Sequence, residues 1–136
     1  MKYMLMMSHS VPEDIDQKHG EMSTWSQDDI KAHFRFMGEF NQELTDAGEL
    51  VDAQGLLGPD HAVIVRAHGQ GAPVVSDGPF PESKEFLAGY WVVDVDSRER
   101  AVEIAARVSA APGRDGVALG IPVEVRQVGE APDADV

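Results

Sequence analysis

Hydrophobic residues along the chain follow two periods, one typical of strands and one typical of helices. Residues 2–8 and 88–96 are apolar on both alternating faces, which is typical of strands covered on two sides. Residues 121–128 alternate valine with charged residues, which indicates a strand with one face in water. Further strands are predicted over 49–57, 61–68 and 73–76, with a glycine-rich hairpin turn between the last two.

A long amphipathic helix is predicted over residues 27–47. Its apolar residues recur at helical spacing: Ile30, Phe34, Met37, Phe40, Leu44 and Ala47. Ser26 is placed to cap the first turn, with Asp29 as its capping-box partner. Gly48 follows as the C-terminal stop. These signals are all local, so the two ends of this helix are well defined by the sequence.

A second helix is predicted after Asp96. Asp96 is expected to be its N-cap, with Glu99 as the box partner. The apolar stripe consists of Ala101, Val102, Ile104, Ala105 and Val108, and the helix ends at 111–113. Between the hairpin and this half of the chain, residues 81–86 are expected to form one helical turn, because proline suits a first helical position.

The order of elements is β-α-β, a hairpin, then β-α-β, which predicts an α+β fold of the ferredoxin-like βαββαβ type with an extra β-hairpin. In that topology 2–8 and 88–96 are the central strands. Two helices cover only one sheet face, so we expect a second copy of the chain to cover the other and form a homodimer. Residues 1–128 are expected to be one domain, with 129–136 a loose acidic tail.

Composition narrows the function classes. The chain has 136 residues, no cysteine and a net charge of −13. Disulfides, thiolate catalysis and cysteine metal sites are therefore excluded. The acidic balance and the scattered basic residues argue against nucleic-acid binding. No apolar run is long enough for a membrane helix, and no targeting segment is recognisable at the start, so we expect a cytoplasmic protein.

The most specific motif lies at residues 77–91. It reads Asp-Gly-Pro-Phe-Pro-Glu-Ser-Lys-Glu-Phe-Leu-Ala-Gly-Tyr-Trp. Together with the opening Met-Lys-Tyr-Met-Leu-Met, the strand after the first helix and the late Val-Glu-Val-Arg at 123–126, it resembles the DGPF branch of the YCII-related family. The resemblance covers nearly the whole chain.

The resemblance implies a dimeric α+β barrel with a ferredoxin-like fold, and no single reaction. Some YCII-related relatives are small-molecule enzymes for which a His–Asp pair has been proposed, the histidine lying in the first helix. In this chain that position falls near Phe36 or Met37, one turn after His33. Many DGPF proteins carry a transcription-initiation label, which the acidic charge of this chain does not support as DNA binding.

Five residues are candidates for a site between the sheet and the loop that precedes the first helix. His9 or His33 could act as a base, with Asp77 as an orienting acid. Tyr90 and Trp25 are candidate ligand contacts, Trp25 as a lid that folds back towards His9. The inventory suits cofactor-free proton transfer of the lyase or isomerase type on a small polar molecule.

Each candidate also has a purely structural interpretation. Asp77 suits a turn that Gly78 and the following proline make rigid. His33 suits the margin of the helix's apolar stripe, and Tyr90 suits the core or an interface. No metal-ligand motif is recognisable. Two hypotheses therefore remain: a dimeric small-molecule-binding or regulatory module, and a small-molecule enzyme.

Overall fold

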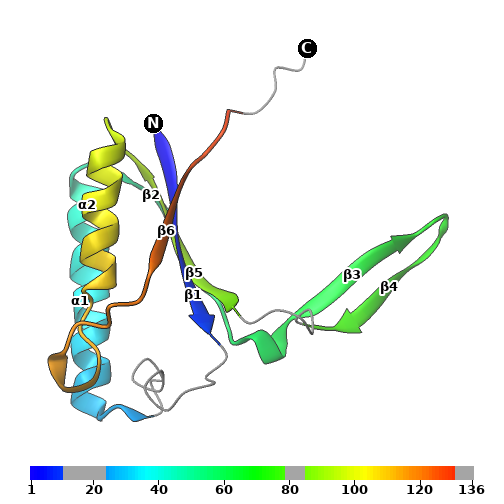
Figure 1. Cartoon of the computed structure of the whole chain (residues 1–136), viewed down its shortest axis with the longest axis horizontal. Coiled ribbons are helices and arrows are strands. Elements are labelled where there is room, and N and C mark those ends of the chain that lie inside the picture. The colour runs from blue at the N-terminus through cyan, green and yellow to red at the C-terminus, as the bar shows by residue number, and fades with distance from the viewer. Residues whose placement is uncertain (11–23, 79–84, 131–136) are drawn as a thin grey trace.

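The computed structural model describes residues 1–10, 24–78 and 85–130. It is an α+β protein in which two helices lie against one face of a four-stranded antiparallel sheet (Figure 1). The sheet consists of β1 (Lys2–Ser10), β2 (Leu50–Gly55), β5 (Glu85–Asp94) and β6 (Val123–Gln127). Its order is β2-β5-β1-β6, so the two strands predicted to be central are the central ones.

Helix α1 (Gln27–Asp46) has the ends that the sequence predicts. The Ser26 hydroxyl accepts from the Asp29 amide at 3.1 Å, and the Asp29 carboxylate accepts from the Ser26 amide at 3.1 Å. This reciprocal pair satisfies amides that would otherwise have no partner in the first turn. Gly48 follows the C-terminus with a φ of +72°, a conformation that glycine adopts without steric cost.

Helix α2 (Arg98–Ser109) begins one residue later than expected. Ser97, rather than Asp96, is the N-cap, and its hydroxyl accepts from the Arg100 amide at 3.2 Å. Ser97 has the extended backbone that a cap requires. The predicted capping role of Asp96 is therefore wrong.

Strand boundaries also differ from prediction by a few residues, and two of these differences concern β5 and β6. Strand β5 begins at Glu85, so Glu85 and Phe86 are extended rather than helical; residues 81–84 of the expected turn lie outside the described residues. Strand β6 begins after Pro122, because proline has no amide to donate to the sheet. Two short 3₁₀ helices, η3 (Pro59–His61) and η4 (Arg114–Gly116), occur in loops.

The hydrophobic core fills the space between the helices and one face of the sheet. Its residues from the strands are Tyr3, Leu5, Trp91 and Val93, with Val95 directly after β5, and its residues from the helices are Phe40, Leu44, Ala101, Ile104, Ala105 and Val108. The indole nitrogen of Trp91 donates to the Asn41 side chain at 2.8 Å, which satisfies its polar group inside this layer.

Two arginines of α2 pair with acidic residues in and just after α1. Arg100 donates to both carboxylate oxygens of Glu49, each at 2.9 Å. Arg107 forms a similar two-point pair with Glu43, at 2.9 and 2.7 Å. In each pair, hydrogen bonds from the arginine lower the pKa of the glutamate. These planar two-point contacts fix the orientation of α2.

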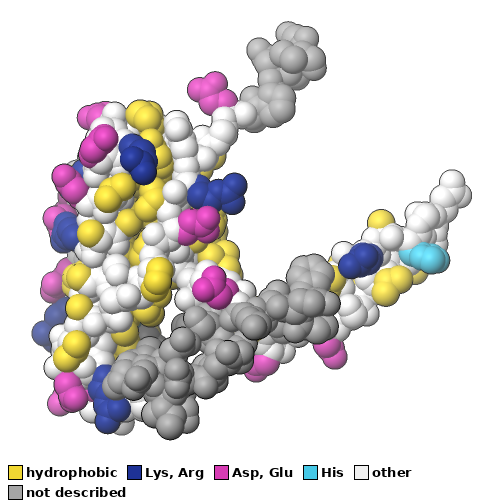
Figure 2. Space-filling model, in the orientation of Figure 1, with side chains coloured by type: hydrophobic (Ala, Val, Ile, Leu, Met, Phe, Trp, Pro, Cys, Tyr) yellow, Lys and Arg dark blue, Asp and Glu magenta, His cyan; other side chains and the backbone are white. Residues whose placement is uncertain are grey.

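A two-stranded hairpin extends away from this body (Figure 1). It consists of β3 (Val63–His68) and β4 (Gly71–Asp77), which, among the described strands, pair only with each other. We call residues 63–77 the arm. The space-filling view shows hydrophobic, arginine and histidine side chains along the arm (Figure 2).

Strands β2 and β5 approach closely at Gly89, and this contact gives a prediction about the free energy of unfolding. A Cβ at Gly89 would lie 2.9 Å from the backbone oxygen of Gln54, a contact that only a strand displacement relieves. We expect Gly89→Ala to lower the free energy of unfolding by roughly 1–3 kcal/mol in chemical denaturation.

Gly55, the strand partner of Gly89, is the matched control. A Cβ at Gly55 meets nothing within 4 Å, so Gly55→Ala should be neutral or stabilising by up to about 1 kcal/mol. Equal stability of the two variants would contradict the close approach.

Candidate functional site

The helices leave one face of the sheet uncovered, and we call it the open face. Strand register places on it the side chains that alternate with the core residues. They are Met4 and Met6 of β1, Tyr90 and Val92 of β5, Asp52 and Gln54 of β2, and Glu124 and Arg126 of β6. The central four are half-buried. The open face therefore has an apolar centre with polar edges.

A bulge in β2 gives Asp52 its position on the open face. Leu50 pairs with Val93 and Asp52 with Val92, so two residues of β2 are accommodated opposite one of β5. Strict alternation from Leu50, which packs on the core, would have turned Asp52 towards the helices. The extra residue instead re-aims its side chain to the open side.

Asp52 and Tyr90 form a hydrogen-bonded pair on this face. The Tyr90 hydroxyl donates to Asp52 Oδ2 at 3.2 Å. The other oxygen, Oδ1, accepts from the Ala53 amide at 2.9 Å and from the Gln54 side chain at 3.1 Å. Partial desolvation, the Asp52 charge and the hydrogen bond to it raise the pKa of Tyr90. At neutral pH the phenol is therefore a hydrogen-bond donor beside a fixed carboxylate acceptor.

His33 lies on the other side of the sheet, in α1. It is 7% exposed, and its Nδ1 lies 3.0 Å from the carbonyl oxygen of Pro112. A carbonyl only accepts, so Nδ1 carries the proton and donates it. This hydrogen bond attaches α1 to the loop after α2. It agrees with the structural interpretation of His33 as a residue at the margin of the apolar stripe.

Trp25 is buried, with 7% of its surface exposed, as expected for an indole that is costly to leave in water. Its ring meets the edge of the His33 ring at a centroid distance of 5.3 Å. It also lies close to Gly113, where an added Cβ would be 3.2 Å from the indole. Trp25 thus packs between α1 and the loop after α2.

The remaining candidates lie on other elements. His9 is in β1 and pairs with Phe86 of β5. Asp77 ends β4 opposite Val63 and is exposed. The structure therefore brings Trp25 and His33 together, but it places Tyr90 on the open face and Asp77 in the arm. Asp52 was not among the predicted residues, because its contact with Tyr90 depends on the bulge and on cross-strand register.

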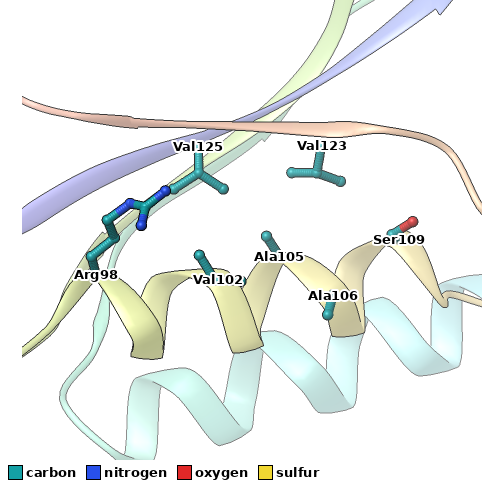
Figure 3. A pocket seen from close by; sticks show the side chains of 7 residues that line it. All are labelled: Arg98, Val102, Ala105, Ala106, Ser109, Val123 and Val125. Atoms are coloured by element: carbon teal, nitrogen blue, oxygen red, sulfur yellow. The ribbon is translucent and has the colours of Figure 1, made fainter.

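An open groove of about 450 Å³ runs between α2 and β6 (Figure 3). Its walls are apolar apart from its ends: Arg98, Val102, Ala105, Ala106, Ser109, Val123 and Val125. The Ser109 hydroxyl donates a hydrogen bond to the carbonyl oxygen of Ile121 at 2.7 Å. In the described part of the chain, no three histidine or acidic side chains are grouped to hold a metal ion. No helix in that part is long and apolar enough to span a membrane.

The sequence is similar to known proteins along most of its length. The sequence matches the model of the YCII-related domain over residues 1–123. The chain belongs to the YCII-related family. It is 30% identical over 110 residues to the uncharacterized protein R00369 of Rhizobium meliloti (strain 1021), an alignment that covers 81% of this chain and 88% of that protein. The matched range contains β1, β2 and β5, and with them Asp52 and Tyr90, whereas β6 lies beyond it except for Val123.

The Tyr90–Asp52 pair gives a prediction about titration. Asp52→Asn removes the charge that disfavours the phenolate, so the pKa of Tyr90 should fall towards its ordinary value of about 10. Tyrosinate absorbance in a Tyr3→Phe background measures it, because Tyr3 and Tyr90 are the two tyrosines.

Glu124→Gln is the control, since it removes an acid of the same face that makes no contact with Tyr90 in the described residues. The sign for stability follows from the raised pKa. The contribution of Tyr90 to the free energy of unfolding is fully present below the pKa of Tyr90 in the unfolded chain, and it is lost as the pH rises through the pKa of Tyr90 in the folded chain. A Tyr90 titration that is the same with and without Asp52 would contradict the assignment.

Proposed function

We propose that this chain acts as a dimeric small-molecule-binding or regulatory module of the YCII-related family, in the cytoplasm and without nucleic-acid contacts. In this proposal two copies face each other through their open faces and enclose a ligand site around Tyr90 and Asp52. The observation that carries it is the hydrogen-bonded Tyr90–Asp52 pair beside half-buried methionine and valine side chains. A polar pair on an apolar surface is typical of small-molecule sites.

The dimer is supported by the distribution of apolar residues. Met4, Met6 and Val92 occupy the centre of a face that no described element covers. A stable interface buries at least about 1,000 Å² in total, and the four strands of this face offer a continuous surface. The order β2-β5-β1-β6 supports a ferredoxin-like sandwich that pairs into a dimeric α+β barrel.

The chemistry of the open face favours a particular class of ligand. Its apolar centre suits a hydrocarbon portion, and Asp52 and Glu124 at its edges are hydrogen-bond acceptors with negative charge. A small polar organic molecule with donor or cationic groups satisfies both. Anionic ligands, including nucleic-acid phosphates, are disfavoured by the net charge of −13.

A second candidate function is cofactor-free proton transfer of the lyase or isomerase type. The Tyr90–Asp52 hydrogen bond favours it, because a phenol and a carboxylate in contact can donate and accept a proton. In this version His9 is the base and Asp77 the orienting acid, and a second copy would have to bring them to the open face. His33 is held by Pro112 and serves this chemistry less well.

The dimer gives the first test. Met6→Glu places a charge at the centre of the open face, so light scattering at micromolar concentration should find the parent dimeric and this variant monomeric. Val102→Glu, an apolar residue exposed on α2, is the control and should stay dimeric. A monomeric parent would refute the dimer.

Ligand binding gives the second test. A panel of small amines, amides and hydroxy compounds is titrated calorimetrically into the parent and into Tyr90→Phe, which keeps the ring and removes the hydroxyl. We expect at least one compound whose affinity falls about tenfold or more in Tyr90→Phe, the cost of leaving a buried polar partner unpaired. Turnover of that compound would favour the enzyme; equal affinity for both proteins would place its binding elsewhere.

A further inference from the structure

We infer that the arm is a docking element that packs against a second copy of this chain. The inference rests on the proposed dimer and adds a second contact to it. The arm pairs with no other strand of the described chain, and an isolated two-stranded hairpin is at best marginally stable in water. Some other surface must therefore stabilise it.

One side of the arm has the composition of a buried surface. Strand register places Val63, Val65 and Val75 on the same side, with Asp77 opposite Val63 at the base of the arm. The three valines are 59%, 59% and 60% exposed, so the described residues leave this valine face largely uncovered. Three adjacent β-branched residues on a twisted ribbon make a contiguous apolar patch, which is typical of an interaction surface.

The direction of the arm favours a second copy of this chain as the partner that the arm contacts. In Figure 1 the helices lie to the left of the sheet, and the arm extends to the right, the side of the open face. The sheet and the arm thus form an angle on the side of the open face. A second copy that covers the open face fills this angle, and two-fold symmetry then places each arm beside the other body.

Charge favours a copy of this chain as the occupant. Residues 61–76 contain no aspartate or glutamate, although the chain has 24 of them, and they include Arg66 and two histidines. No acidic group of the described residues pairs with Arg66. Two bodies of this charge repel each other, whereas the acid-free stretch 61–76 approaches an acidic body with less repulsion, and Arg66 is attracted to it. Asp77, at the base of the arm, is its one acidic residue.

Hydrogen exchange across a dilution series tests the inference. The full-length parent is studied above and below the concentration at which light scattering finds half of it dimeric. We expect amides of β3 and β4 to exchange at least about tenfold more slowly in the dimer than in the monomer. Fast arm exchange in a proven dimer would overturn the arm contact alone, leaving the open-face dimer in place.

Two other outcomes also overturn it. Arm amides that are equally protected in monomer and dimer would show that the chain covers its own arm. A chain that is monomeric throughout would refute the proposed dimer itself, and the arm contact with it.

Matched substitutions on the two sides of β4 give an independent test. Val75→Glu changes the valine face, and Val74→Glu changes the opposite side of the same hairpin, where Val74 is 52% exposed. We expect Val75→Glu to raise the dimer dissociation constant about tenfold or more, and Val74→Glu to change it less than about threefold. Equal effects would mean that the substitutions act through hairpin stability, and would overturn docking by the valine face.

Discussion

Two helices bury only one face of a four-stranded sheet, although its two central strands are apolar on both. On the covered side Leu5 and Val93 are completely buried, and each such aliphatic side chain contributes about 1.5–3 kcal/mol. On the open side Met4, Met6 and Val92 stay half-exposed, so burial of these side chains stabilises the fold less. A monomer would gain solubility from polar residues there. Their apolar character is therefore best explained by a surface that is covered in the working protein.

The polar groups at the edges of the open face make it more than a packing surface. Asp52 accepts three hydrogen bonds, which fixes its carboxylate in one orientation on an edge strand. The bulge at the same point disrupts the strand pairing locally and turns the Asp52 side chain to the open side. Rigid placement of a charge beside a phenol is the kind of preorganisation that a binding site requires.

Local signals in the sequence predicted α1 and the central strands but placed the N-cap of α2 one residue too early, and features that depend on register could not be predicted. The ends of α1 follow from Ser26, Asp29 and Gly48, which act within one turn, and the central strands follow from their two apolar faces. The site could not be read in this way. Asp52 and Tyr90 are 38 residues apart, and alternation without the bulge would have assigned Asp52 to the core.

If two open faces closed on each other, a bound ligand would also stabilise the interface between the two copies. A two-fold pair brings two copies of Asp52 and Glu124 towards one enclosed space, where carboxylates lose water and repel one another. The raised pKa of Tyr90 keeps its phenol protonated, and Tyr90 and Gln54 both donate to Asp52, which offsets part of this cost. Arg126 places one positive charge on the same face as the two carboxylates, so a net negative charge remains in each copy. A donor-rich or cationic ligand compensates this charge, whereas an empty, dry interface would leave it uncompensated.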